Sequence, residues 1–99
     1  MPQSDLDGGD VAAAVLADLD ALALTALLDE ICRRRGVLAH AVCGRSRMLS
    51  VCRARQELWW RIRNHPERHY SYLEIARLFR RDHTTVLHGV VTHDARQRP

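Results

Sequence analysis

Apolar residues between positions 51 and 63 recur at helical intervals, and no segment shows the alternation of apolar and polar residues that is typical of a strand. The predicted inner face of this helix carries Val51, Ala54, Leu58, Trp59 and Ile62. The charged side chains lie largely elsewhere around it, at Arg53, Glu57 and Arg61. A chain of 99 residues has room for one core of this kind. The sequence therefore predicts an all-α fold, a small helical bundle in one domain over residues 10–95.

The first third of the chain is acidic at its start and then rich in Ala and Leu. Residues 1–9 have little apolar surface to bury, so we expect a disordered acidic tail. After Asp10, a candidate N-cap, good helix formers continue without Pro or Gly until Gly36, which is suited to end a helix. One helix fits this stretch, and so do two helices with a restart at Asp20 or Thr25.

Glycine and serine residues mark the next helix boundaries. Residues 37–43 form a short apolar stretch that predicts a brief helix, and Gly44 is positioned to end it. Ser50 is the candidate N-cap of the helix over 51–63.

Two short helices are predicted near the C-terminal end of the chain. Ser71 and Glu74 have the spacing of a capping box, in which the serine and the glutamate each satisfy the other's backbone N–H. The helix that starts there breaks at Arg80–Arg81, and Asp82 can cap a last helix of about ten residues. Beyond it the chain becomes more polar, so we expect its end to fray.

The two short helices have the register of a helix-turn-helix at about residues 71–93. Counted from Tyr72, the fifth position is Ala76, a small residue where the helices approach closely. The fifteenth position is Val86, which is predicted to be buried. The ninth position favours a positive φ and is commonly glycine, but here it is Arg80.

The basic residues are all arginine, and the chain contains no lysine. This excludes a Walker A loop, a Schiff-base enzyme and a lysine-dependent kinase, so we expect a protein that is not an enzyme and that binds neither nucleotide nor cofactor. Residues 1–30 carry seven acidic groups and no basic side chain, whereas residues 31–99 carry fifteen arginines and five acidic groups, a formal charge of +10. Such a balance favours a polyanionic partner, and nucleic acid is the leading class.

The segment Arg81-Asp82-His83-Thr84-Thr85-Val86-Leu87-His88 resembles the signature of the C-terminal DNA-binding domain of DnaA, the bacterial chromosomal replication initiator. Upstream, Val51-Cys52-Arg53-Ala54-Arg55-Gln56 is similar to the family's V-A-R-P-R-Q, and Ser71-x-x-Glu74-Ile75 is similar to its S-L-P-E-I. The resemblance covers roughly residues 22–93 and implies a Trp-repressor-like helical fold that binds double-stranded DNA.

The resemblance also implies a role for each matching residue. Base reading in the major groove falls to Asp82, His83, Thr84 and Thr85. Minor-groove contact falls to Arg47. Contacts to the DNA backbone fall to Arg45, Arg55, Gln56, Ser71, Arg81 and His88. The chemistry agrees, because a carboxylate accepts from cytosine N4, Thr and His contact base edges, and Arg suits phosphates and narrow minor grooves.

The sequence departs from the family pattern at a few positions near these residues. Ala54 replaces the family's proline, and the turn F-G-G-R-D is shortened to Phe79-Arg80-Arg81-Asp82. The loop before Ser71 is about two residues longer, and Leu49 stands where the family often has a basic residue. The first two changes predict altered affinity or register on DNA. Because leucine cannot pair with a phosphate, residue 49 is expected not to bind the DNA backbone.

The cysteines and histidines do not form the pattern of a metal site or a disulfide framework. Cys32, Cys43 and Cys52 are odd in number and lack a C-x-x-C spacing, so we expect reduced thiols, mostly buried. His65 and His69 are separated by Pro66, which argues against a zinc site. No apolar run is long enough for a membrane helix and no signal peptide is apparent, so the chain is expected to be cytoplasmic.

The sequence favours a free-standing module that binds sites resembling the initiator's recognition box, with a possible use in replication initiation or transcription. The acidic segment 11–28 could pack as the first helix of the DnaA domain, extend that helix, or bind a protein partner or a second copy as a homodimer. One alternative is a protein-interaction adaptor that keeps the fold without DNA binding, which Arg80 and the acidic segment suggest. Another is a detached part of a DNA enzyme such as a transposase.

Overall fold

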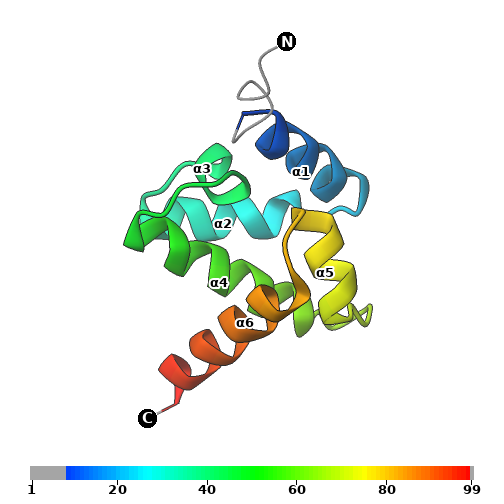
Figure 1. Cartoon of the computed structure of the whole chain (residues 1–99), viewed down its shortest axis with the longest axis vertical. Coiled ribbons are helices and arrows are strands. Elements are labelled where there is room, and N and C mark those ends of the chain that lie inside the picture. Colours follow the sequence, from blue (N-terminus) through cyan, green and yellow to red (C-terminus); the bar gives the residue numbers. More distant parts are fainter. Residues whose placement is uncertain (1–8, 99) are drawn as a thin grey trace.

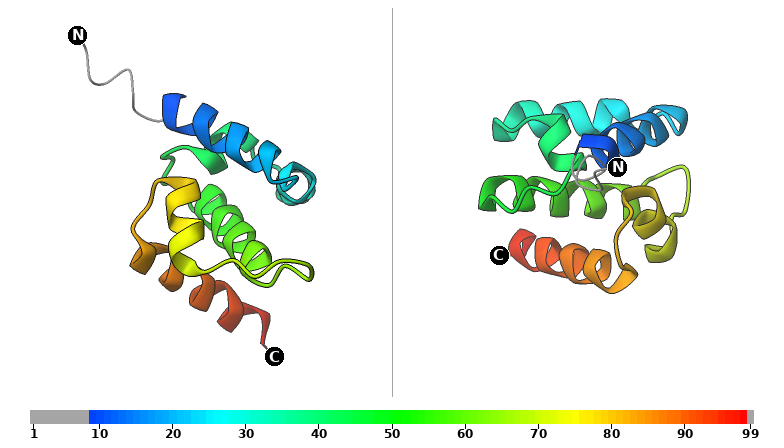
Figure 2. Two further views of the ribbon diagram at one scale, coloured as in Figure 1. Left: turned by 90° about the vertical axis from the view of Figure 1, so that its right-hand side faces the viewer. Right: turned by 45° about the horizontal axis from the view of Figure 1, so that its top comes forward.

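The structure is a computed structural model that describes residues 9–98. These residues form six helices and no strand, which confirms the predicted all-α fold: α1 (Gly9–Ala21), α2 (Thr25–Arg35), α3 (Ala39–Cys43), α4 (Leu49–Arg63), α5 (Tyr72–Phe79) and α6 (His83–Gln97). Helix α4 lies in the middle of the molecule, with α2 packed on one side and α6 on the other (Figures 1 and 2). One hydrophobic cluster contains buried residues from all six helices.

The Ala- and Leu-rich segment forms two helices, the second of the two possibilities that the sequence left open. Between them the backbone of Ala23 is left-handed (φ 60°), which costs a residue with a Cβ about 1 kcal/mol. The turn buries Leu24, whose N–H donates to the Leu19 carbonyl oxygen at 2.8 Å. Helix α2 then begins at Thr25 without a side-chain cap, and Asp20 lies inside α1.

Helix α1 packs its apolar side into the common core. Ala12, Val15 and Leu19 are fully buried, and α1 lies against α3 and α5 (Figure 1). It begins at Gly9, one residue before the predicted N-cap Asp10. The remainder of the predicted disordered tail lies outside the described residues. The acidic segment 11–28 thus contributes α1, which packs into the core as a helix of its own, and the first residues of α2.

The two predicted glycine stops and the serine cap have different outcomes. Gly36 ends α2 in the left-handed conformation (φ 69°, ψ 35°), as predicted. Gly44 ends α3 with φ −97° and ψ −143°. The predicted cap at Ser50 is wrong, because α4 already begins at Leu49 and no side chain caps it. Instead, the Oγ of Ser46 accepts a hydrogen bond from the Met48 N–H at 3.3 Å in the turn ahead of the helix.

Glu57 is buried, although the helical pattern placed it on the polar side of α4. Its carboxylate pairs with Arg34 and, at 2.6 Å, with the Nε of Arg35, so it joins α4 to the end of α2. Burial alone raises the pKa of Glu57, but the hydrogen bonds and charges of Arg35 and Arg34 outweigh it and hold this pKa below its ordinary value of 4.5.

Glu57→Gln should lower the free energy of unfolding at pH 7 by about 1–2 kcal/mol, less than for a fully buried pair because Arg34 is half-exposed. Since the pKa of Glu57 is lower in the folded state, its ionised form stabilises the fold above the unfolded pKa, and this contribution disappears as the pH falls through the folded pKa. The difference between variant and parent should therefore shrink on acidification below about pH 4.5 in urea titrations. Glu67→Gln, a change at an exposed loop residue, is the control; a constant difference for Glu57→Gln down to pH 2.5 would contradict this reading.

The capping box at the start of α5 is confirmed. The Ser71 Oγ accepts from the Glu74 N–H at 3.0 Å, and the Ser71 N–H donates to the Glu74 carboxylate at 2.8 Å.

Helix α6 has 15 residues instead of about ten. The reason is that the buried seam of Val86 and Val90 continues to His93, a residue that looked polar in the sequence. Trp59 is in the core, and the half-buried Trp60 packs against His93 and donates to Asp94 at 3.2 Å.

The turn between α5 and α6 has the predicted helix-turn-helix form. Ala76 and Val86 are buried, as their register positions require. Arg80 adopts the left-handed conformation (φ 54°, ψ 48°) that glycine usually supplies there. The Arg81 N–H then donates to the Ala76 carbonyl oxygen at 2.8 Å, which closes the turn.

Candidate nucleic-acid interface

The first turn of α6 presents polar side chains to solvent. Asp82 is at the N-cap position in an extended conformation (φ −66°, ψ 141°), and its side chain makes no capping hydrogen bond. Capping and base reading therefore do not compete for its oxygens in this structure. Asp82, His83, Thr84 and Thr85 are all exposed.

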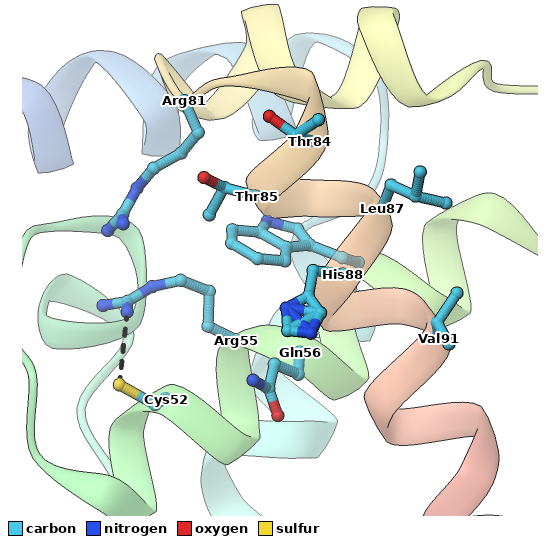
Figure 3. Close-up of a pocket in the computed structure, with 11 residues that line it drawn as sticks. Cys52, Arg55, Gln56, Arg81, Thr84, Thr85, Leu87, His88 and Val91 are labelled. Atoms are coloured by element: carbon cyan, nitrogen blue, oxygen red, sulfur yellow. Dashed lines mark hydrogen bonds between the residues drawn. The ribbon is translucent and has the colours of Figure 1, made fainter.

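A groove of about 670 Å³ lies between α4 and α6, next to this turn. Figure 3 shows that Arg81, Thr84, Thr85 and His88 reach it from the turn and α6, whereas Arg55 and Gln56 reach it from α4. The groove therefore brings together six of the residues predicted from sequence. The exposed apolar side chains of Leu87 and Val91 also border it.

Positive charge is concentrated at one end of the groove. The guanidinium groups of Arg55 and Arg81 lie on the same side in Figure 3, and both bond to the Gly44 carbonyl oxygen, at 3.3 and 2.8 Å. Burial lowers the pKa of Arg81, and the charges of Arg55 and Arg45 lower it further. Both arginines stay protonated, because a guanidinium is not deprotonated in proteins. Such a convergence of cations is suited to an anion such as phosphate.

Arg55 is buried, and backbone carbonyl groups occupy its guanidinium. It donates to the carbonyl oxygens of Val42 at 2.8 Å and Ala41 at 3.0 Å, in addition to Gly44. These carbonyls end α3, where a short helix leaves acceptors unsatisfied. Burial lowers the pKa of Arg55, and the neighbouring Cys52 partly opposes this. A contact between Arg55 and a phosphate would require these hydrogen bonds to be given up.

Helix α6 meets α4 at Gly89, where there is no room for a side chain. A Cβ at Gly89 would come within 2.8 Å of Cε3 and 2.9 Å of Cζ3 of the Trp59 ring. The ring is buried and packs edge-on against Phe79, with centroids 5.9 Å apart. This contact determines how far the groove-lining face of α6 stands from α4.

The other predicted residues do not line the groove. Arg45 and Arg47 are exposed in the loop before α4, followed by the exposed apolar residues Met48 and Leu49. Ser71 lies at the start of α5, where both its N–H and its Oγ take part in the capping box. Gln56, within the groove, accepts from Arg96 at 2.8 Å, which links α4 to the last turn of α6.

His93 is a buried polar residue whose position the sequence analysis missed. Neither ring nitrogen has a hydrogen-bond partner, and burial lowers the pKa of His93 below its ordinary value, so the ring is held neutral. The helical spacing could have predicted this burial, because His93 follows Val86 and Val90 on one face of α6. Its chemistry looked like that of a surface residue, and only the packing against Trp60 explains its burial.

Among residues 9–98 there is no group of three or more His, Cys, Asp or Glu that could hold a metal ion. The cysteines are free thiols, and Cys32 and Cys43 are buried. Burial raises the pKa of the Cys43 thiol to about 12, which makes it an unreactive part of the core. No helix in the described part of the chain is long and apolar enough to cross a membrane.

Of the comparisons with known proteins, one finds a match, and it is to a protein family. No curated protein and no solved structure matches the chain. The family described as bacterial dnaA protein helix-turn-helix matches residues 24–92, which include α5, the left-handed turn and most of α6. This match covers more than half of the sequence and all the residues assigned to DNA by resemblance. The chain therefore belongs to the family of bacterial DnaA helix-turn-helix domains.

Proposed function

We propose that this protein binds duplex DNA in a sequence-specific manner, with the first turn of α6 in the major groove. The observation that carries the proposal is the exposed run Asp82–Thr85 beside a groove that contains two converging guanidinium groups. Family membership supports DNA binding as the general function. Recognition of sites that resemble the initiator's box is the more specific part of the proposal.

The side chains of this turn have complementary capacities for reading bases. The Asp82 carboxylate accepts from cytosine N4, and it is free to do so because it does not cap α6. His83 and the two threonines offer donors, acceptors and methyl groups to base edges. Because all four side chains are exposed at one helix end, they can address neighbouring base pairs without rearrangement of the core.

The arginines around this turn would orient the protein on the duplex. Arg81 faces the groove and keeps donors beyond its one bond to Gly44, so it is suited to a phosphate. His88 and Gln56 add polar contacts along the same groove. We assign Arg45 to the DNA backbone and Arg47 to the minor groove, where an arginine responds to the enhanced negative potential; both side chains are exposed.

Two of the residues assigned to the DNA backbone have a different role in this proposal. Arg55 stabilises the wall of the groove by donating hydrogen bonds to the carbonyl groups at the end of α3. We assign its effect on DNA binding to this structural role. Ser71 fixes the start of α5 through the capping box and contributes at most its remaining hydroxyl donor to a phosphate.

His83→Ala should weaken binding to the preferred duplex by about 1–3 kcal/mol and leave binding to a scrambled duplex nearly unchanged, because a base reader contributes only where the correct base is present. Arg45→Ala should weaken binding to both duplexes alike, since a phosphate contact carries no sequence information. Arg33→Ala removes the same charge from the exposed side of α2, across α4 from α6, and serves as the control. Competition titrations measure all three; equal losses on both duplexes for His83→Ala would refute its role as a base reader.

A further inference from the structure

We propose that Asp18 of α1 is a positioning residue for DNA binding, which acts by holding Arg80 in the turn before α6. The inference rests on the proposed function. One nitrogen of the Arg80 guanidinium, Nη1, lies 2.6 Å from the Asp18 Oδ2 and 2.8 Å from the Leu78 carbonyl oxygen. Helix α1 lies outside the segment that matches the DnaA family, so this contact adds an element from beyond the matched domain.

The turn needs such support because its left-handed residue carries a side chain. With φ 54° and ψ 48°, Arg80 occupies a region that favours glycine and disfavours residues with a Cβ. The bonds to Asp18 and Leu78 fold the long side chain back over α5 and favour this backbone conformation. An arginine at this place is therefore compatible with the turn when a carboxylate is there to receive it.

The position of the candidate DNA-binding residues depends directly on this turn. The residue after Arg80 is Arg81, whose N–H closes the turn on Ala76 and whose guanidinium reaches the groove. Asp82 then begins α6. A change in the backbone of Arg80 would therefore reorient both the anion-binding end of the groove and the first turn of α6.

Helix α1, which carries Asp18, is anchored in the core. Leu19, the neighbour of Asp18, is fully buried, as are Ala12 and Val15 on the same side of α1. Asp18 also borders a small cavity of about 300 Å³ between α1 and α5, which Glu74 and Arg77 line as well. Arg68 and Arg77 also line this cavity, but among the residues that the structure describes the ion pair of Asp18 is with Arg80.

The proposal predicts that loss of the Asp18 carboxylate weakens DNA binding, whereas loss of a negative charge in general strengthens it. Neutralising a carboxylate makes the protein more positive, which by itself strengthens binding to DNA. Asp18→Asn should instead weaken binding to the preferred duplex by about two- to fivefold, the range for one exposed ion pair. Asp20→Asn loses the same charge from an exposed position on the same helix and should bind as tightly as the parent, or more tightly.

A double-mutant cycle distinguishes this positioning effect from a loss of stability. Arg80→Gly suits the left-handed turn without help, so Asp18→Asn in that background should behave like Asp20→Asn. The proposal is overturned if Asp18→Asn binds as tightly as Asp20→Asn in the parent background. It is also overturned if Asp18→Asn loses the same factor when residue 80 is glycine.

Amide hydrogen exchange tests the effect of the Asp18–Arg80 ion pair on the turn in the absence of DNA. Exchange of the Arg81 amide, which donates to Ala76, should become about two- to fivefold faster in Asp18→Asn and stay unchanged in Asp20→Asn. If the parent protein binds no DNA, the proposed function fails while this exchange difference persists. If the parent binds DNA and the exchange rates do not differ, the role of Asp18 fails alone.

Discussion

Arg55→Ala is expected to lower the free energy of unfolding by about 2–4 kcal/mol, because it leaves carbonyl groups at the buried end of α3 without their charged donor and removes a packed side chain. For a domain of this size, the midpoint of thermal unfolding should fall by at least about 10 °C. Binding to preferred and scrambled duplexes should weaken together, since the groove loses its support.

Matched variants separate this structural role from a direct phosphate contact. Arg53→Ala removes the same charge from an exposed position on the same helix and should change stability by no more than about 0.5 kcal/mol. Arg55→Lys retains the charge but not the fork of donors, so it should recover only part of the loss. If Arg55→Ala is as stable as Arg53→Ala and still loses affinity for all DNA, Arg55 contacts phosphate directly.

Gly89→Leu is expected to destabilise the fold by about 2–3 kcal/mol and to move α6 away from α4. Even the first added carbon would overlap the Trp59 ring, which cannot retreat because it is buried against Phe79. The better helix propensity of leucine, worth under about 1 kcal/mol, does not offset this overlap. Urea unfolding gives the stability change, and near-ultraviolet circular dichroism of the tryptophans reports the displacement of the helix.

Ala95→Leu introduces the same side chain at an exposed position of α6 and is the control. Trp59→Leu combined with Gly89→Leu tests the mechanism, since a smaller side chain at residue 59 leaves room for the new one. The double variant should be more stable than the sum of the single changes predicts. A Gly89→Leu protein as stable as Ala95→Leu would show that Trp59 does not set the spacing of the two helices.

The helices and the exposed first turn of α6 could be predicted from sequence because their signals are local. The apolar stripe of α4, the capping box of Ser71 and Glu74 and the small residue at Ala76 each act within one or two turns. The resemblance to DnaA added the roles of the residues in α6, and the family match confirms that resemblance.

The interactions that the sequence could not predict join residues that are far apart in the chain. Glu57 pairs with arginines 22 and 23 positions away, and Asp18 pairs with Arg80 at a separation of 62. A helical pattern places Arg55 beside the apolar stripe but cannot show that the end of α3 supplies its acceptors. The sequence allowed a restart at Thr25 but did not decide for it, because no local breaker marks the left-handed Ala23 and the buried Leu24 packs in the tertiary core.

The arrangement explains how a small core can support the surface that we propose to read DNA. Arg55 fixes the end of α3 under the groove, Gly89 lets α6 lie close on Trp59, and the left-handed Arg80 sets the start of α6. The side chains proposed to read bases then project from a helix end that the core holds in place.

The central claim is that this surface reads DNA sequence. Fluorescence anisotropy should be measured with the full chain on a duplex that carries the initiator's recognition box and on its scrambled version, each at two salt concentrations. We expect a preference of at least about a hundredfold that persists as salt rises, with a log–log salt slope near −5 for about six phosphate contacts. Equal affinities for the two duplexes, or no binding to either, would contradict the claim.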